Sequence, residues 1–120
     1  MWQQLLRRWK KPAASIYVVR ARHLAMTDPE GWSIRELLII NERGLHARAA
    51  ARFVEVAGHF DAEITVSKDD HTVPARSIMG LLLLVAGLGS SITVAARGVD
   101  APQALAALAD LAEKRFNEAK

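Results

Sequence analysis

The chain contains no cysteine, which excludes disulfide bonds and any metal site with thiolate ligands. A reducing compartment suits such a chain but is not required by it. The longest apolar stretch, Leu81 to Leu88, is far shorter than the roughly 20 residues of a membrane-spanning helix. Apolar residues still make up 51% of the 120 residues, which is enough for the core of one domain.

The positive charge is concentrated at the front of the chain. Residues 1–35 carry a net charge of +5, whereas residues 36–120 carry −2. The high isoelectric point therefore describes the front end, and we predict no nucleic-acid binding by the domain. The chain also lacks a P-loop, a paired-carboxylate motif and a nucleophile elbow, so nothing predicts nucleotide hydrolysis or acyl transfer.

Residues 1–32 differ in composition from the rest, and we predict a basic N-terminal extension there and a domain over residues 33–120. Residues 1–11 place two tryptophans and two leucines at helical spacing beside four basic side chains, the pattern of a helix on an anionic membrane surface. A disordered tail, or an over-extended start with the true one at Met26, is the alternative that we favour. Membrane contact through residues 1–11 is therefore not expected.

Beyond the extension, the spacing of apolar residues predicts the order β-α-β-β-α-β-α, an α+β fold. Strands are expected over residues 34–41, 61–67, 73–75 and 91–96, and helices over 47–57, about 77–85 and from 101 onward. They would form a four-stranded, mainly antiparallel sheet with three helices on one face.

Two of the helix starts carry capping signals. Ser77 is expected to cap the second helix, in which we assign Leu81, Leu82 and Val85 to the core. Asp100 and Gln103 have the spacing of a capping box at the start of the third helix, with Pro102 in its first turn.

A single histidine, His46, stands at the N-cap of the first predicted helix, in the sequence Gly44-Leu45-His46-Ala47-Arg48. The unpaired amides of Ala47 and Arg48 and the helix dipole would favour an anion there. The same positive end disfavours an imidazolium, so a neutral, nucleophilic nitrogen is expected near pH 7. The arrangement suits the receipt and release of a phosphoryl group, with help from Arg48. The alternative from spacing alone is a histidine that only caps the helix or occupies a surface turn.

The remaining candidates are weaker. His46, His59 and His71 are separated by 13 and 12 residues, which matches no compact ligand pattern, and no acidic cluster lies between them, so no metal site is predicted. Ser77 is either a plain helix cap or a regulated site, because a phosphate at that position would meet a helix N-terminus.

Three segments carry a resemblance to a known family: RGLHARAAARFV, ARSIMGLLLL and GSSITVAARG, at residues 43–54, 75–84 and 89–98. Their order and distances resemble the HPr family, the histidine phosphocarriers of the bacterial phosphoenolpyruvate-dependent phosphotransferase system. The resemblance covers about residues 34–118. It implies an HPr-like open-faced β-sandwich, and a phosphoryl carrier without a cofactor rather than a stand-alone enzyme.

The resemblance also implies residue roles. His46 corresponds to the histidine that is phosphorylated on Nδ1, and Arg48 to the arginine that helps bind and release the phosphoryl group. Ser77 corresponds to a regulatory serine, which in some bacteria is phosphorylated by HPr kinase/phosphorylase. Ile78 and Met79 correspond to part of the apolar patch that docks on enzyme I and on IIA proteins.

The sequence departs from the family at Ala49, where proline is common. Because proline pre-organises a first helical turn, alanine gives this helix start slightly more freedom. The departure resembles the nitrogen-related branch, or carriers from bacteria that lack a full sugar system, and it favours a regulatory role over sugar transport. We therefore expect a cytoplasmic, monomeric carrier between enzyme I and IIA proteins; the alternative is a non-transferring regulatory binding protein controlled at Ser77.

Overall fold

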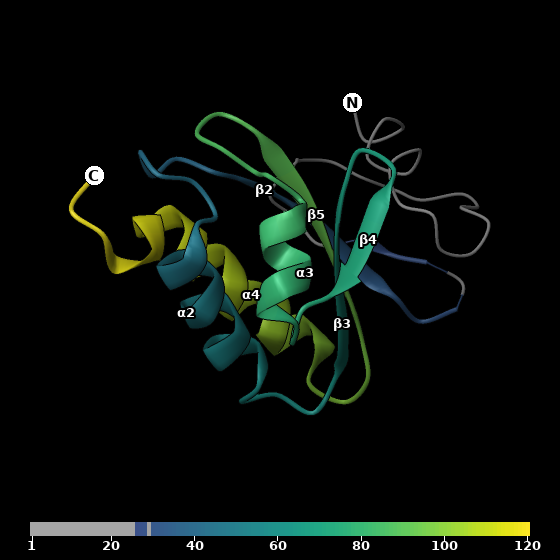
Figure 1. Cartoon of the computed structure of the whole chain (residues 1–120). Coiled ribbons are helices and arrows are strands. Elements are labelled where there is room, and N and C mark those ends of the chain that lie inside the picture. The colour runs from purple at the N-terminus through teal and green to yellow at the C-terminus, as the bar shows by residue number, and fades with distance from the viewer. Residues whose placement is uncertain (1–25, 29) are drawn as a thin grey trace.

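The computed structural model describes residues 26–28 and 30–120. It shows an α+β fold in which helices pack on an antiparallel sheet (Figure 1). The predicted order of elements is confirmed from β2 to α4, and a two-residue strand precedes it. The elements are β1 (Met26–Thr27), β2 (Ser33–Leu38), α2 (Ala47–Ala57), β3 (Glu63–Lys68), β4 (His71–Pro74), α3 (Ile78–Leu83), β5 (Ser91–Arg97), α4 (Ala101–Glu113) and a 3₁₀ turn, η1 (Arg115–Asn117).

The strands form one sheet in the order β1-β2-β5-β3-β4, with antiparallel neighbours throughout. The four predicted strands are confirmed, and β1 adds a short edge strand to β2 through the pair Met26↔Ile34. Trp32 is 2% exposed, and the guanidinium of Arg97 lies 4.6 Å from its ring centroid. The described end of the predicted extension thus contributes to the sheet, whereas the predictions for residues 1–25, including 1–11, lie outside the described residues.

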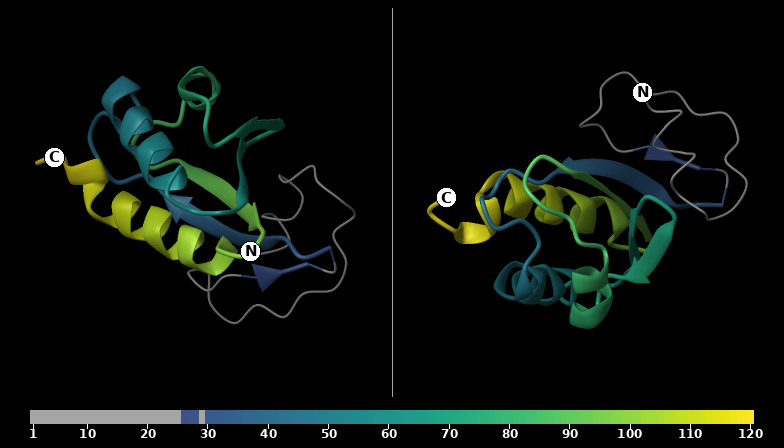
Figure 2. Two further views of the ribbon diagram at one scale, coloured as in Figure 1. Left: turned by 90° about the horizontal axis from the view of Figure 1, so that it is seen from below. Right: turned by 45° about the horizontal axis from the view of Figure 1, so that its top comes forward.

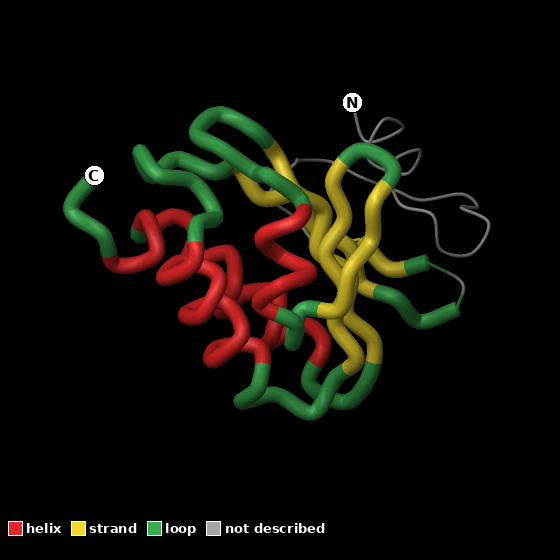
Figure 3. Tube along the Cα trace, viewed as in Figure 1, coloured by secondary structure: helices red, strands yellow, loops and turns green. Residues whose placement is uncertain are grey.

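The three helices α2, α3 and α4 lie on one side of the sheet, as predicted (Figures 2 and 3). Helix α2 turns Ala49, Ala50, Phe53 and Ala57 into the core, so its apolar face follows the expected helical spacing. Small alanines on that face let α2 approach α4, with which it packs. From the sheet, alternate residues of β3 and β5 complete the core, namely Ile64, Val66, Ile92, Val94 and Ala96.

The prediction for Val85 is wrong, because this side chain is 78% exposed. Helix α3 ends at Leu83, and Val85 has a φ of 51°, so the helical spacing that starts at Leu81 no longer applies there. Leu84 is buried in its place, at 5% exposure. Leu81 is buried and Leu82 packs against the core, as expected.

The capping signals have opposite outcomes. Ser77 caps α3 as predicted, since its Oγ accepts a hydrogen bond from the amide of Gly80 at 2.9 Å. Asp100 occupies the N-cap of α4 but makes no capping hydrogen bond, so the predicted capping box is wrong. Its carboxylate accepts instead from the amide of Asp61 at 2.7 Å, which ties the start of α4 to the loop before β3.

Alanine substitutions at the adjacent positions 84 and 85 test which of the two side chains is buried in the turn after α3. Leu84→Ala should lower the free energy of unfolding by about 2–5 kcal/mol, because it empties part of the core. Val85→Ala should change it by less than about 0.5 kcal/mol, because that side chain is in solvent. Urea unfolding followed by circular dichroism measures both. Equal losses in the two variants would contradict this account of the turn.

Candidate functional site

His46 lies at the N-cap of α2 in an extended conformation, with φ −81° and ψ −176°. Its carbonyl accepts the first helical hydrogen bond, from Ala50 at 2.8 Å, which leaves the amides of residues 47–49 without helical partners. The imidazole makes no capping hydrogen bond to these amides. The side chain is 23% exposed, so part of the ring faces solvent at the positive end of the helix.

Gly44 shapes the turn that delivers His46. Its φ of 67° suits glycine, and a Cβ atom built on it would lie only 2.5 Å from the carbonyl oxygen of Ala86. The next residue, Leu45, is 4% exposed and its amide donates to the same Ala86 oxygen at 2.8 Å. The loop that follows α3 therefore packs directly on the turn and determines where the ring lies.

The C-terminal segment returns to this turn after α4. Arg115, Phe116 and Asn117 all have φ between 54° and 63°, and this left-handed turn reverses the chain. Phe116 is fully buried, and its carbonyl accepts a hydrogen bond from Nη1 of Arg52. Further along, the amide of Glu42 donates to the carbonyl of Lys120 at 2.8 Å, so the last residues lie beside the loop before α2 (Figure 1).

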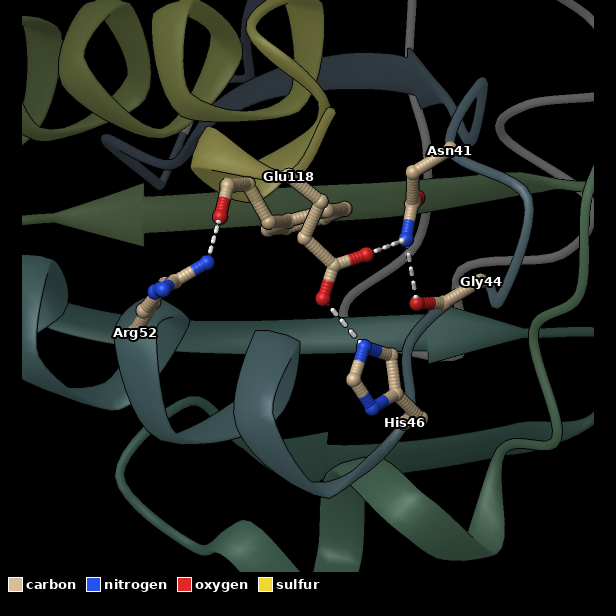
Figure 4. A network of polar contacts seen from close by, with 6 residues as sticks. Asn41, Gly44, His46, Arg52 and Glu118 are labelled. Atoms are coloured by element: carbon tan, nitrogen blue, oxygen red, sulfur yellow. Dashed lines mark hydrogen bonds and ion pairs between the residues drawn. The ribbon is translucent and has the colours of Figure 1, made fainter. Parts of the chain in front are cut away.

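This return places a carboxylate against the histidine (Figure 4). Oε2 of Glu118 is hydrogen-bonded to Nε2 of His46, and Oε1 accepts from Nδ2 of Asn41 at 3.0 Å. The same Asn41 nitrogen donates to the carbonyl of Gly44 at 2.7 Å. Asn41 is fully buried and the Glu118 side chain is 13% exposed, so the network is largely shielded from water.

Opposing effects act on the Glu118 carboxyl group. Burial raises its pKa, but the hydrogen bonds from Asn41 and His46, together with electrostatic attraction to His46 and Arg52, lower the pKa below its ordinary value. The group is therefore an ionised carboxylate at neutral pH. His46 thus has a negative charge on the side of Nε2, and the described residues make no hydrogen bond to Nδ1.

Arg48, on the first turn of α2, is exposed and lines an open polar cavity of about 520 Å³. Four basic side chains take part in the lining, so the surface beside the His46–Glu118 pair favours anions. The lining residues are Glu42, Arg43, Arg48, Arg52, Asn117, Glu118, Ala119 and Lys120.

Residues 34–114 match the sequence model of the family described as PTS HPr component phosphorylation site. This stretch runs from β2 to the end of α4 and contains the turn at Gly44, His46 and α2. The chain belongs to the HPr family. It is accordingly a phosphocarrier protein of the phosphotransferase system, a carrier of phosphoryl groups rather than a catalyst, as the resemblance implied.

Relatives and solved structures of HPr proteins agree with this assignment. The chain is 43% identical to the phosphocarrier protein HPr of Cupriavidus necator over 84 residues, which cover 70% of this chain and 94% of the relative. It is 44% identical to the phosphocarrier protein NPr of Shewanella violacea over 85 residues, covering 71% and 93%. The crystal structure of HPr-C-His from Thermoanaerobacter tengcongensis aligns with a TM-score of 0.70 at 41% identity, covering 72% of this chain and 98% of that one.

The other candidate residues of this HPr domain lie on and after α3. Ser77 is half-buried at its cap, whereas Ile78 and Met79 are 39% and 68% exposed. We call the apolar residues exposed here the α3 patch; they are Ile78, Met79, Leu83, Val85 and Leu88. Helix α3 packs against α2, so the α3 patch and His46 belong to neighbouring elements.

The described residues contain neither a cluster of metal-ligating side chains nor a helix that could span a membrane. Within residues 26–28 and 30–120, no three side chains of metal-ligating type come together. In the same part of the chain, every helix is too short or too polar to cross a lipid bilayer.

Sequence reasoning missed Glu118, which contacts His46, and Asn41, which holds Glu118. Asn41 follows a buried strand, where a polar residue is unusual, and this position was a usable signal. Glu118 gave none, because 72 residues separate it from the histidine and it lies in an ordinary polar tail.

Gly44→Ala should lower the free energy of unfolding by about 2 kcal/mol or more, since the new Cβ would collide with backbone atoms of residues 86–87. Gly87→Ala is a suitable control, because a Cβ there would meet no atom within 4 Å. Chemical unfolding of the two variants measures the difference. If Gly44→Ala is as stable as Gly87→Ala, the described contact does not constrain the turn.

Proposed function

We propose that this carrier accepts a phosphoryl group from enzyme I on Nδ1 of His46 and passes it to a IIA protein. The observation that carries the proposal is the position of the ring at the open N-terminus of α2. Nε2 is engaged by Glu118, whereas Nδ1 has no hydrogen-bond partner among the described residues. Nδ1 is therefore the nitrogen that is available as a nucleophile.

The surroundings supply charge stabilisation for the phosphoryl group. The amides of Ala47, Arg48 and Ala49 belong to the first turn of α2, where the helix dipole favours a negative charge. The Arg48 guanidinium lies on the same exposed turn and can pair with phosphoryl oxygens. None of these groups positions a water molecule for attack, which suits a carrier that must keep its phosphoryl group until a partner arrives.

The α3 patch is our candidate for the surface that binds partners. Ile78 and Met79 begin it, and Leu83, Val85 and Leu88 extend it with exposures of 61–78%. An apolar group of this kind on a small domain is typical of a protein-binding surface. The proposed partners are enzyme I and IIA proteins. A role in nitrogen-related regulation is supported by Ala49 and by the similarity to NPr of Shewanella violacea.

Labelling identifies the acceptor residue. Incubation of the full chain with enzyme I and ³²P-labelled phosphoenolpyruvate should give an acid-labile label that is absent from His46→Ala. Arg48→Ala should still be labelled, but about 10- to 100-fold more slowly, because a charged hydrogen bond to the phosphoryl group is lost.

His59→Ala provides the matched control for labelling. His59 is exposed at the opposite end of α2, and its replacement should leave the labelling rate unchanged. A label that persists in His46→Ala would exclude His46 as the acceptor.

The second candidate function is regulation at Ser77, either alongside phosphoryl transfer or in a protein that only binds partners. The specific observation in its favour is that the Ser77 hydroxyl caps α3, directly before the exposed side chains Ile78 and Met79. A phosphate on this oxygen would add negative charge at the edge of the α3 patch. HPr kinase/phosphorylase is the proposed modifying enzyme in bacteria that possess it.

The charge on Ser77 can be imitated by substitution. Ser77→Asp should weaken binding of enzyme I or a IIA protein by about tenfold, because charge next to an apolar interface carries a desolvation cost. Ser77→Ala separates charge from capping: it should lose about 1 kcal/mol of stability but retain binding. Isothermal titration calorimetry measures the affinities. Unchanged affinity of Ser77→Asp would argue against control at this residue.

The two functions are distinguished by His46→Ala. A protein that acts only through binding keeps its regulatory effect in cells that carry this variant, whereas a carrier loses it. Cytoplasmic location and a monomeric state remain predictions.

A further inference from the structure

We propose that Glu118 is a positioning residue for the phosphoryl acceptor: it keeps the ring proton of His46 on Nε2 and so presents the lone pair of Nδ1 to the phosphoryl donor. This inference rests on the proposed function of His46. It assigns a role in the transfer site to the C-terminal segment, which lies outside the residues 34–114 that match the family.

The hydrogen-bonding capacity of the two groups determines which ring nitrogen carries the proton. An ionised carboxylate can only accept hydrogen bonds, so the imidazole nitrogen that contacts it must carry a proton. A neutral imidazole has one ring proton, and the Glu118 contact is made by Nε2. The proton is therefore on Nε2, and the lone pair of Nδ1 points away from the carboxylate (Figure 4).

The carboxylate is itself held in place. Asn41 uses one buried amide nitrogen to bind both Oε1 of Glu118 and the carbonyl of Gly44, two residues before His46. The backbone of the segment is anchored on either side of Glu118, by the buried Phe116 ring and by the hydrogen bond between Glu42 and Lys120. A carboxylate fixed in this way orients the ring as well as its proton, as carboxylates do for metal-binding histidines.

The same contact is suited to the charge that develops during transfer. The Nδ1 lone pair forms the bond to phosphorus while the bond from phosphorus to the donor atom breaks, and that electron pair stays with the donor. The ring keeps its Nε2 proton and becomes an N-phosphoryl imidazolium with one positive charge. Glu118 lies against this cation and stabilises it. When the group moves on, the electron pair of the N–P bond returns to Nδ1 and the ring is neutral again.

The experiment uses the full chain with Glu118→Ala and Glu118→Gln, and Glu113→Gln as the matched control. Glu113 is an exposed carboxylate at the end of α4, five residues before Glu118. Two quantities are measured for each protein. One is the rate of phosphoryl transfer from phosphorylated enzyme I at varied carrier concentration. The other is the protonation of the two His46 ring nitrogens, from ¹⁵N chemical shifts in neutral solution.

Glu118→Ala should lower the maximal transfer rate about tenfold, the effect of losing one charged hydrogen bond, with an unchanged KM because the α3 patch is intact. Its His46 ring should show a larger fraction with the proton on Nδ1. Glu118→Gln should fall between wild type and Glu118→Ala, since its amide oxygen still accepts a hydrogen bond without the charge. Glu113→Gln should behave as wild type.

Wild-type rates and wild-type ring protonation in Glu118→Ala would overturn the inference. A higher KM with an unchanged maximal rate would also overturn it, because that result would indicate a role in docking. His46→Ala, measured in parallel, separates this failure from that of the proposed function: if His46→Ala still accepts the label, the acceptor itself is misassigned. Circular dichroism of each variant shows whether the fold is kept.

Discussion

The close contact between Gly44 and the loop after α3 is the constraint on which the site depends. A Cβ atom on residue 44 would lie only 2.5 Å from the Ala86 oxygen, so there is no room for a side chain there. The chain can therefore pass from β2 to α2 only in this sharp turn, with Leu45 buried and His46 outside. The ring is placed at the helix N-terminus by backbone packing, and not by a contact of its own with the helix.

Around this rigid turn, the domain combines an apolar interior with one small polar network. Asn41 and Glu118 come from opposite ends of the domain sequence, and both contacts converge on a single histidine and its loop. A buried asparagine is unfavourable unless it is hydrogen-bonded. The amide nitrogen of Asn41 makes two such bonds, whereas its Oδ1 has no partner among the described residues. The network thereby connects the C-terminal segment to the proposed site of phosphoryl transfer, while the α3 patch, our proposed partner-binding surface, lies on and after the neighbouring α3.

Prediction from the sequence succeeded where local periodicity determines structure. The core face of α2, with Ala50, Phe53 and Ala57, follows from helical spacing, and Ser77 is recognisable as a cap from its position. It failed where a neighbour in space competes with the local pattern. Asp100 bonds to the amide of Asp61 instead of capping α4, and Val85 leaves the helical spacing through a left-handed turn.

The sequence by itself determined the elements from β2 to α4, their order, the family and the placement of His46 before a helix, because these depend on residues close together in the chain. Only the tertiary structure decided what lies next to the imidazole. Glu118 reaches it through three consecutive left-handed residues after α4, and the hydrogen bond it makes joins positions 72 residues apart. No local pattern encodes such a pair, because its distance depends on the packing of α4, the sheet and α2 together.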